Sequence, residues 1–154
     1  MRKIKIKKNI TDIKYKSKIV TYFINHIMKR GKKNLAIKIF YNTLNFIKEK
    51  FNKKYPLEIL KKAIEKGSPE LEIKKIKIGG SIYNIPTKIK KKKSKFLCVK
   101  WLIKNAKLRK DKNMSIKLAN EIINTYNGIG ETIKKKNEIK KVAEANKAFS
   151  YLKF

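Results

Sequence analysis

The residues best placed to do chemistry in this 154-residue chain are lysines around a Gly-Gly pair, in a window that contains no carboxylate. No Asp or Glu occurs between positions 73 and 110, and within that window two short runs rich in isoleucine meet at Gly79 and Gly80. Adjacent glycines supply the positive φ angles that a two-residue hairpin turn needs. Lysine ammonium groups bind phosphate as point charges. The window therefore predicts a cationic two-stranded finger suited to contacts along nucleic acid.

The composition extends this prediction to the whole molecule. The chain has 43 basic and 11 acidic residues, a formal net charge of +32, and a hydrophobic fraction of 42%. That fraction is typical of a globular protein rather than a disordered basic tail. A folded protein of this charge repels itself unless a polyanion neutralises it. Arginine occurs only at positions 2, 30 and 109, so the surface favours holding a phosphate backbone over reading base edges.

Catalytic and metal-binding chemistry finds few residues to carry it. Cys98 and His26 are the only residues of their types, which excludes a disulfide framework, a multi-cysteine zinc site and a histidine pair. The carboxylates alternate with lysines at spacings that suit i,i+4 ion pairs on helices, and neither a phosphate-cradling glycine loop nor a metal motif occurs. We expect no enzymatic activity, no metal and no cofactor.

No membrane partner is expected either. The longest apolar runs are far shorter than a membrane span, and the N-terminus lacks the apolar segment of a signal peptide. A single cysteine suits a soluble protein of a reducing compartment.

Helical periodicity and turn residues divide the chain into a basic arm, residues 1–16, and one mainly α-helical domain, residues 17–154. Six helices and one β-hairpin are expected in the domain, with the hairpin between the third and fourth helices. Helix starts and stops follow capping residues, Pro and Gly. The first three helices are expected to begin at Ser17, Asn34 and Pro56, and the first and third to end at Gly31 and Gly67. The hairpin follows at about 71–89, the fourth helix begins near Ser94, and the fifth ends at Asn127 and Gly128. The sixth helix spans roughly 131–149, and its apolar stripe consists of Ile139, Val142, Ala143 and Phe149.

The first strand of the hairpin changes phase along its length. Leu71 and Ile73 alternate in one phase, and Ile76 and Ile78 in the opposite one. Because side chains alternate with a period of two in a strand, this change predicts a β-bulge near residues 74–75. In the return strand Pro86 must occupy an unpaired edge position. Tyr83, beside the turn, could stack on a base or pack against the protein.

The fourth helix separates into two faces. At 100° per residue Cys98 and Trp101 fall on an apolar side, and we interpret both as core residues. The opposite side carries a stripe of four lysines within about 60°. We interpret it as an anion-binding surface rather than a solvated face, because it lies in the acid-free window. The stripe consists of Lys93, Lys100, Lys104 and Lys107.

The remaining acidic residues are unevenly distributed. A second window without acids covers positions 13–48, whereas carboxylates gather between positions 49 and 72 and on the last two helices. This distribution predicts one strongly positive side and one milder side. His26, in the second window, is interpreted as a helix-edge residue rather than a catalytic base. Met114 opens the fifth helix and either packs there as a hydrophobic staple or touches a base.

Four blocks of this sequence, in matching order and spacing, resemble the family of small-subunit ribosomal protein seven, of bacterial or organellar type. The blocks are residues 78–86 (IGGSIYNIP), 101–103 with 106–114, 117–121 (KLANE) and 143–149 (AEANKAF). The resemblance covers nearly the whole chain and implies six helices with a projecting hairpin. It also implies direct binding to the 3′ major domain of small-subunit rRNA, nucleation of assembly of the subunit head, and a hairpin near exit-site tRNA and the mRNA path. Ribosomal proteins nine and eleven of the small subunit are the implied neighbours.

Site residues follow from the resemblance position by position. The family commonly has arginine where this chain has Lys74, Lys75 and Lys77, and its Arg-Gly-Asp turn has lysine at position 110 here. The hairpin tip near tRNA and mRNA corresponds to Gly79, Gly80, Ser81, Tyr83 and Asn84. The implied rRNA contacts, to which the lysine stripe is added, are Arg2, Lys3, Lys5, Lys7 and Lys8 in the arm, Lys32 and Lys33 after Gly31, Lys75 and Lys77 in the hairpin, and Lys107, Arg109, Lys110, Lys112 and Met114.

Two other classes of protein compete with this interpretation. A generic architectural protein that packages nucleic acid needs a basic surface but no particular RNA; the hairpin tip offers only Ile82 and Tyr83 as an apolar wedge. A nuclease needs a carboxylate or histidine cluster, which the sequence does not assemble. The expected location is the ribosome in a bacterial cytoplasm, or in the matrix or stroma of an organelle with its own genome, because no transit extension is recognisable.

Overall fold

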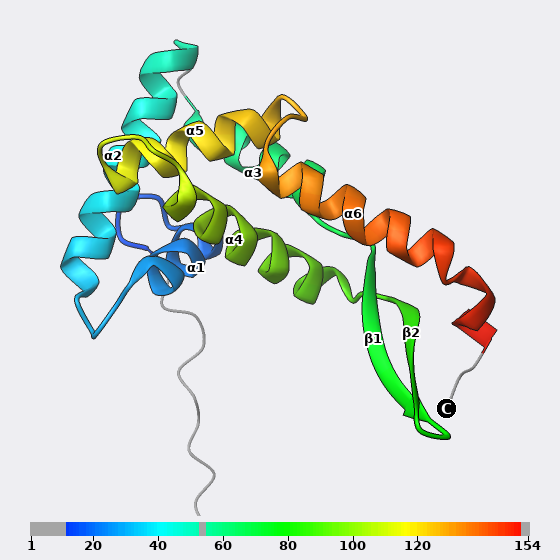
Figure 1. The fold of residues 1–154 in the computed structure, drawn as a ribbon. Coiled ribbons are helices and arrows are strands. Elements are labelled where there is room, and N and C mark those ends of the chain that lie inside the picture. The colour runs from blue at the N-terminus through cyan, green and yellow to red at the C-terminus, as the bar shows by residue number, and fades with distance from the viewer. Residues whose placement is uncertain (1–11, 53–54, 152–154) are drawn as a thin grey trace, which may run out of the picture.

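The computed structural model describes residues 12–52 and 55–151, which fold into six α-helices and one β-hairpin (Figure 1). The predicted fold is thereby confirmed: the hairpin is antiparallel and lies between the third and fourth helices. The arm residues Arg2, Lys3, Lys5, Lys7 and Lys8 lie outside the described residues. The elements are α1 (Lys18–Ile27), α2 (Lys33–Phe51), α3 (Pro56–Gly67), β1 (Leu71–Ile78), β2 (Ser81–Lys88), α4 (Lys91–Leu108), α5 (Met114–Tyr126), α6 (Glu131–Ala145) and a 3₁₀ turn, η1 (Lys147–Tyr151).

Helices α1 to α5 build the core, and α5 packs against α2, α3 and α4. Leu118 and Ile122 of α5 are fully buried, and the rings of Phe23 and Phe40 stack with centroids 5.0 Å apart between α1 and α2. Full burial of such a side chain stabilises the fold by roughly 1.5–3 kcal/mol. The apolar side of α4 faces this core as predicted, since Cys98 is fully buried and Trp101 is 7% exposed.

Two helix boundaries differ from the expected ones. Helix α1 ends at Ile27 rather than at Gly31, and the chain then turns through Arg30 and Gly31, which have φ angles of +50° and +73°. Helix α4 begins at Lys91, three residues before Ser94. The Ser94 hydroxyl donates a hydrogen bond to the Pro69 carbonyl, 2.5 Å away, so this serine joins α4 to the end of α3 instead of capping a helix.

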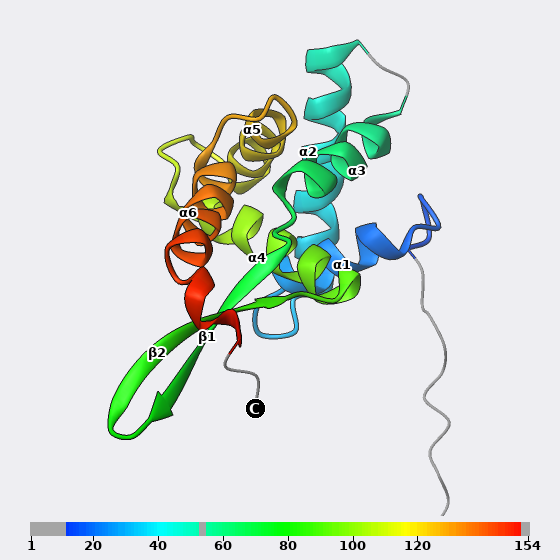
Figure 2. The same ribbon diagram turned by 90° about the vertical axis from the view of Figure 1, so that its right-hand side faces the viewer.

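The last helix is shorter than expected and leaves the core. Figure 2 shows α6 running from the helical body to the hairpin, where η1 contacts β2. Val142 is 42% exposed, whereas its neighbour Ala143 is buried. The prediction that Val142 belongs to an apolar core stripe is therefore wrong. The helix has passed the edge of the core at this point, and only a narrow side of it is covered.

The hairpin contains no bulge. Its register is continuous from Leu71, opposite Lys88, to Ile78, opposite Ser81. The apolar residues of β1 change phase because different elements cover its two halves. Leu71, in the first half, lies beside α6. Ile76, in the second half, pairs with Tyr83, whose ring contacts Phe149 of η1. The backbone carbonyl of Glu70 accepts a hydrogen bond from the backbone N–H of Ile89. Hydrogen-bonded and non-hydrogen-bonded pairs alternate along an antiparallel hairpin. Counted from Glu70 and Ile89, the pair of Ile73 and Pro86 is a non-hydrogen-bonded one, so Pro86 stands where no backbone N–H is needed, as predicted.

Gly67 ends α3, as predicted. A glycine is needed here because neighbouring side chains fill the space that a Cβ atom would take. A Cβ atom on Gly67 would lie 2.8 Å from the Sγ atom of Cys98 and 3.1 Å from Cγ2 of Thr125. Real Cβ atoms essentially never come within 3.0 Å of another atom, as this one would with the Cys98 sulfur. Helices α3, α4 and α5 can therefore meet here only because this position has no side chain.

We expect the substitution Gly67→Ala to lower the free energy of unfolding by about 1–3 kcal/mol, the usual cost of an overpacked core. This cost opposes the better helix propensity of alanine, roughly 1 kcal/mol. Urea unfolding followed by circular dichroism measures the change. The double substitution Gly67→Ala with Cys98→Ala removes the nearest atom and should recover part of the loss; a single variant as stable as the wild type contradicts the packing argument.

Candidate nucleic-acid interface

The lysine stripe of α4 is present and exposed. Lys100, Lys104 and Lys107 are all exposed along one side of the helix, opposite the buried Cys98 and Leu102. Within the described part of the chain no carboxylate lies within 4.0 Å of these three ammonium groups. Three unneutralised cations on a rigid helix are suited to successive phosphates, and each phosphate bound releases counterions.

Lys93, the fourth residue of the stripe, is placed differently. Its ammonium group lies 2.5 Å from the carboxylate of Glu72, near the base of the hairpin, although 54% of its side chain is exposed. Exposed ion pairs contribute about 0–1 kcal/mol, so a phosphate can compete for this lysine. The pair also joins the first turn of α4 to β1.

The hairpin presents lysines along its length and an open tip. Lys74, Lys75 and Lys77 are exposed, and Gly79 and Gly80 have φ angles of +56° and +89°. Two positive φ angles at the central positions define a type I′ turn, which only glycine adopts at little cost. Apart from the neighbouring residues of the chain, no atom lies within 4 Å of a Cβ built at either glycine, so the space beside the turn is open there. Ser81 and Ile82 next to it are also exposed.

Tyr83 and Asn84 point to the protein rather than to free solvent. The Tyr83 ring meets Phe149 of η1 edge to face, with centroids 5.3 Å apart. Of the two alternatives for Tyr83, packing is the one that the structure shows. The side-chain oxygen of Asn84 is buried and accepts no hydrogen bond from the described residues. The tip available to a ligand is therefore centred on residues 79–82.

The structure brings together two basic segments that are far apart in the sequence. Lys32, at the end of the turn before α2, and Lys33, the first residue of α2, are exposed. Lys32 shares a groove of about 260 Å³ with Lys107 at the end of α4 and Met114 at the start of α5. Met114 is partly buried and packs against the core. Of its two alternatives, the structure shows packing, at the floor of a groove whose edges are cationic.

Arg109 belongs to a buried network that the sequence did not reveal. Its guanidinium donates to Asp111, with Nε 3.0 Å from Oδ2, and to Glu121, with Nη1 3.1 Å from Oε2. Glu121 is fully buried, and its other oxygen accepts from the Thr132 backbone and hydroxyl, at 3.2 and 2.8 Å. The general expectation that the carboxylates pair with lysines four residues away on a helix does not hold for Glu121, whose partner is Arg109. The available signal was its helical phase, because it lies three residues after Leu118 and four before Thr125, both fully buried.

The hydrogen bonds between Arg109 and its carboxylate partners shift the pKa values of Arg109 and Asp111. Burial acts to lower the pKa of Arg109, but the hydrogen bonds to Asp111 and Glu121 outweigh it, and the pKa is raised. The hydrogen bond from Arg109 lowers the pKa of Asp111. Arg109 is thus a permanent cation held by two carboxylates, and its contact with rRNA stays a prediction. Its neighbours Lys110 and Lys112 are exposed.

Cys98 and His26, the only cysteine and histidine of the chain, both pack against other side chains of the protein. Burial raises the pKa of the Cys98 thiol to about 12, so it is protonated at neutral pH. His26 lies at the edge of α1, stacked on Tyr22 with centroids 4.8 Å apart. Within residues 12–52 and 55–151 no three His, Cys, Asp or Glu side chains gather into a possible metal site. No helix of this same part of the chain is long and apolar enough to cross a membrane.

The sequence is similar to one group of known proteins along its whole length. The family model described as ribosomal protein S7p/S5e matches residues 1–147. A protein of Mycoplasma capricolum named small ribosomal subunit protein uS7 is 46% identical over 156 aligned residues, covering 100% of both chains. The protein of Euglena gracilis named small ribosomal subunit protein uS7c is 49% identical over 140 residues, covering 91% of this chain and 89% of its own. The uS7 protein of Carsonella ruddii is 44% identical over 144 residues, covering 94% and 92%.

Proposed function

Because this chain belongs to the ribosomal protein S7p/S5e family, we propose that it is a structural protein of the small ribosomal subunit that binds rRNA directly. One observation carries the proposal: Lys100, Lys104 and Lys107 form an exposed row without carboxylate partners among the described residues. The row ends at the groove that Lys107 shares with Lys32. The three lysines of the row and Lys32 are together called the anchoring surface below.

We assign the anchoring surface to the 3′ major domain of the rRNA, where binding would nucleate assembly of the subunit head. The assignment is supported by the resemblance of the four sequence blocks and by the net charge of +32, which a large polyanion must neutralise if the protein is to fold compactly. The acid-free window leaves phosphate as the natural counter-charge for this surface. The protein would act by positioning RNA and would catalyse no reaction.

The hairpin has a separate role in this proposal. Its open tip, residues 79–82, extends beyond the helical body (Figures 1 and 2). A narrow tip without bulky core residues suits a passage shared with other molecules. We assign it to the neighbourhood of exit-site tRNA and mRNA, with small-subunit proteins nine and eleven as neighbours. The ribosome concerned would be that of a bacterium or of an organelle with its own genome.

Binding to rRNA, compared with binding to DNA, tests the proposal. The full chain should bind a fragment of the 3′ major domain clearly more tightly than a duplex DNA of equal length at 150 mM salt, because an RNA-specific shape adds to the electrostatic attraction that both polymers share. The fragment should also raise the melting temperature, since a ligand of the native state alone stabilises it. Equal affinity for both polymers favours a generic packaging protein and contradicts the proposal.

A further inference from the structure

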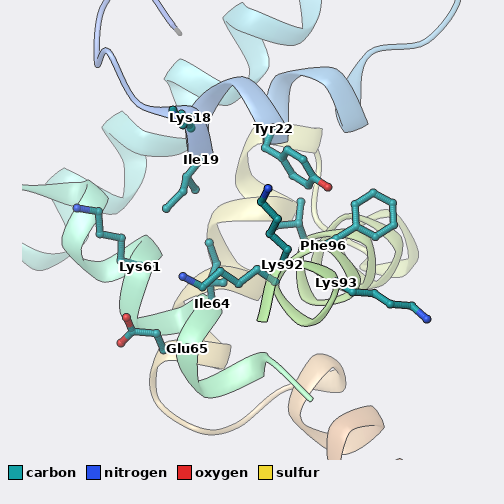
Figure 3. A pocket seen from close by; sticks show the side chains of 11 residues that line it. Lys18, Ile19, Tyr22, Lys61, Ile64, Glu65, Lys92, Lys93 and Phe96 are labelled. Atoms are coloured by element: carbon teal, nitrogen blue, oxygen red, sulfur yellow. The ribbon is translucent and has the colours of Figure 1, made fainter. Parts of the chain in front are cut away.

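A cavity of about 700 Å³ lies between α1, α3 and α4, beside the lysine stripe (Figure 3). Its walls are apolar, with Ile19 and Tyr22 from α1, Ile64 from α3, and Phe96 and Val99 from α4. Sites for small molecules and cofactors usually have volumes of roughly 300–1,000 Å³. The cavity is therefore large enough for a nucleotide, and the anchoring surface does not include it.

Two aromatic rings form one side of this cavity and are held in place before any ligand binds. Tyr22 and Phe96 meet edge to face with centroids 5.7 Å apart. His26 stacks on Tyr22 and meets Phe96 at 5.1 Å, and its Nδ1 atom donates to the backbone carbonyl of Tyr22 at 2.8 Å. Tyr22 nonetheless remains 38% exposed. An aromatic ring fixed in this way loses little conformational entropy on binding.

The rim of the cavity is cationic. Figure 3 shows Lys61 and Glu65 of α3 across the opening from Tyr22 and Phe96, with Lys93 directed away from it. Glu65 is the single carboxylate among the lining residues, and it forms no ion pair with them. The rim lysines other than Lys93, which binds Glu72, are Lys18, Lys61, Lys92 and Lys95.

A lysine rim around aromatic walls selects among possible occupants. The basic arm of this same chain has five cations and no acid in residues 1–11, so like charge disfavours it. A single-stranded nucleic acid offers both required parts, because each nucleotide has a flat base that stacks on aromatic side chains and a phosphate that binds lysine. An acidic protein segment satisfies the rim through its carboxylates, but those side chains offer no aromatic ring to stack, whereas every nucleotide carries a base beside its phosphate.

We propose that this cavity binds an unstacked nucleotide of single-stranded RNA, with its base against Tyr22 and Phe96 and the flanking phosphates on Lys61, Lys92 and Lys95. The inference rests on the proposed function, since it requires that RNA is the partner of this protein. It adds a site that takes one splayed nucleotide from a loop or bulge, next to a surface that holds phosphates alone.

Substitution of Tyr22 tests the inference in the full chain. Tyr22→Leu should weaken binding to the 3′ major domain fragment about 5- to 150-fold, the usual effect of losing one base stack. The salt dependence of binding should stay unchanged, because stacking releases no counterions. Lys61→Gln should act differently, because it removes one phosphate contact: the slope of log K against log salt concentration should become shallower by about 0.7. Tyr22→Phe, which keeps the ring, should bind like the wild type.

The matched control is Tyr55→Leu, at a tyrosine that is 65% exposed and does not line the cavity. Circular dichroism melting verifies that each variant is folded. Affinity of Tyr22→Leu equal to that of the wild type overturns the inference while leaving the proposed function intact, whereas a wild type that does not bind the fragment overturns both. A photoreactive benzoylphenylalanine at position 96 should crosslink to an unpaired nucleotide in reconstituted small subunits; a crosslink to a protein overturns the inference in favour of a protein occupant.

Discussion

Replacing Arg109 by alanine is expected to lower the free energy of unfolding by about 3–5 kcal/mol, because Glu121 then keeps a buried charge without its cation. Glu121 has no exposed surface, and Arg109 is the only cation within ion-pair distance of it in the described part of the chain. The network joins the end of α4 to α5 and to Thr132 at the start of α6. For a domain of this size the melting temperature should fall on the order of 10 °C, as differential scanning calorimetry measures.

Three variants separate the buried charge from a general loss of positive charge. Lys110→Ala removes an exposed cation next to Arg109 and should change stability little. Arg109→Lys keeps the charge but lacks the planar guanidinium whose Nε and Nη1 atoms reach the two carboxylates separately, so an intermediate loss is expected. The double substitution Arg109→Met with Glu121→Gln removes both charges and should recover much of the stability. Arg109→Ala with the stability of the wild type contradicts the role assigned to this network.

The second large effect is expected on RNA binding. The triple substitution Lys100→Gln, Lys104→Gln and Lys107→Gln should reduce the slope of log K against log salt by about 2.1–2.7, for three lost phosphate contacts at 0.7–0.9 each. Between 50 and 200 mM salt the affinity advantage of the wild type over the variant should therefore shrink about 20- to 40-fold. Titration of the full chain with the 3′ major domain fragment at four or more salt concentrations measures both slopes.

A variant of equal charge serves as the control for this measurement. Lys134→Gln, Lys140→Gln and Lys141→Gln remove three exposed lysines of α6, where Lys134 and Lys140 already have carboxylate partners. This variant should keep most of the wild-type slope, because its three lysines lie on α6, outside the anchoring surface. Equal slopes for the two triple variants would mean that net charge alone governs binding, and the anchoring surface would then have no special role.

Local features of the fold were predictable because they depend on neighbours in the sequence. Gly79 and Gly80 between isoleucine-rich runs determined a type I′ hairpin, and Pro56 determined the start of α3. The two faces of α4 followed from helical phase, which holds for any regular helix. Contacts between elements had no such local signal. The phase change in β1 was misread as a bulge, because the hairpin is covered by α6 on β1 and by η1 on β2, and both elements lie more than 50 positions further along the chain.

The sequence by itself determined the family, through the four blocks that resemble it. It also determined the charge, the helices and the lysines that face solvent, because composition and periodicity act within one element. Only the tertiary structure decided which charged groups are free. It paired Arg109 with Glu121 and Lys93 with Glu72, and it left Lys100, Lys104 and Lys107 without carboxylate partners among the described residues. It also gathered Tyr22, Phe96 and five lysines around one cavity. Burial and ion pairing are properties of distances across the fold, and residue spacing along a chain does not contain those distances.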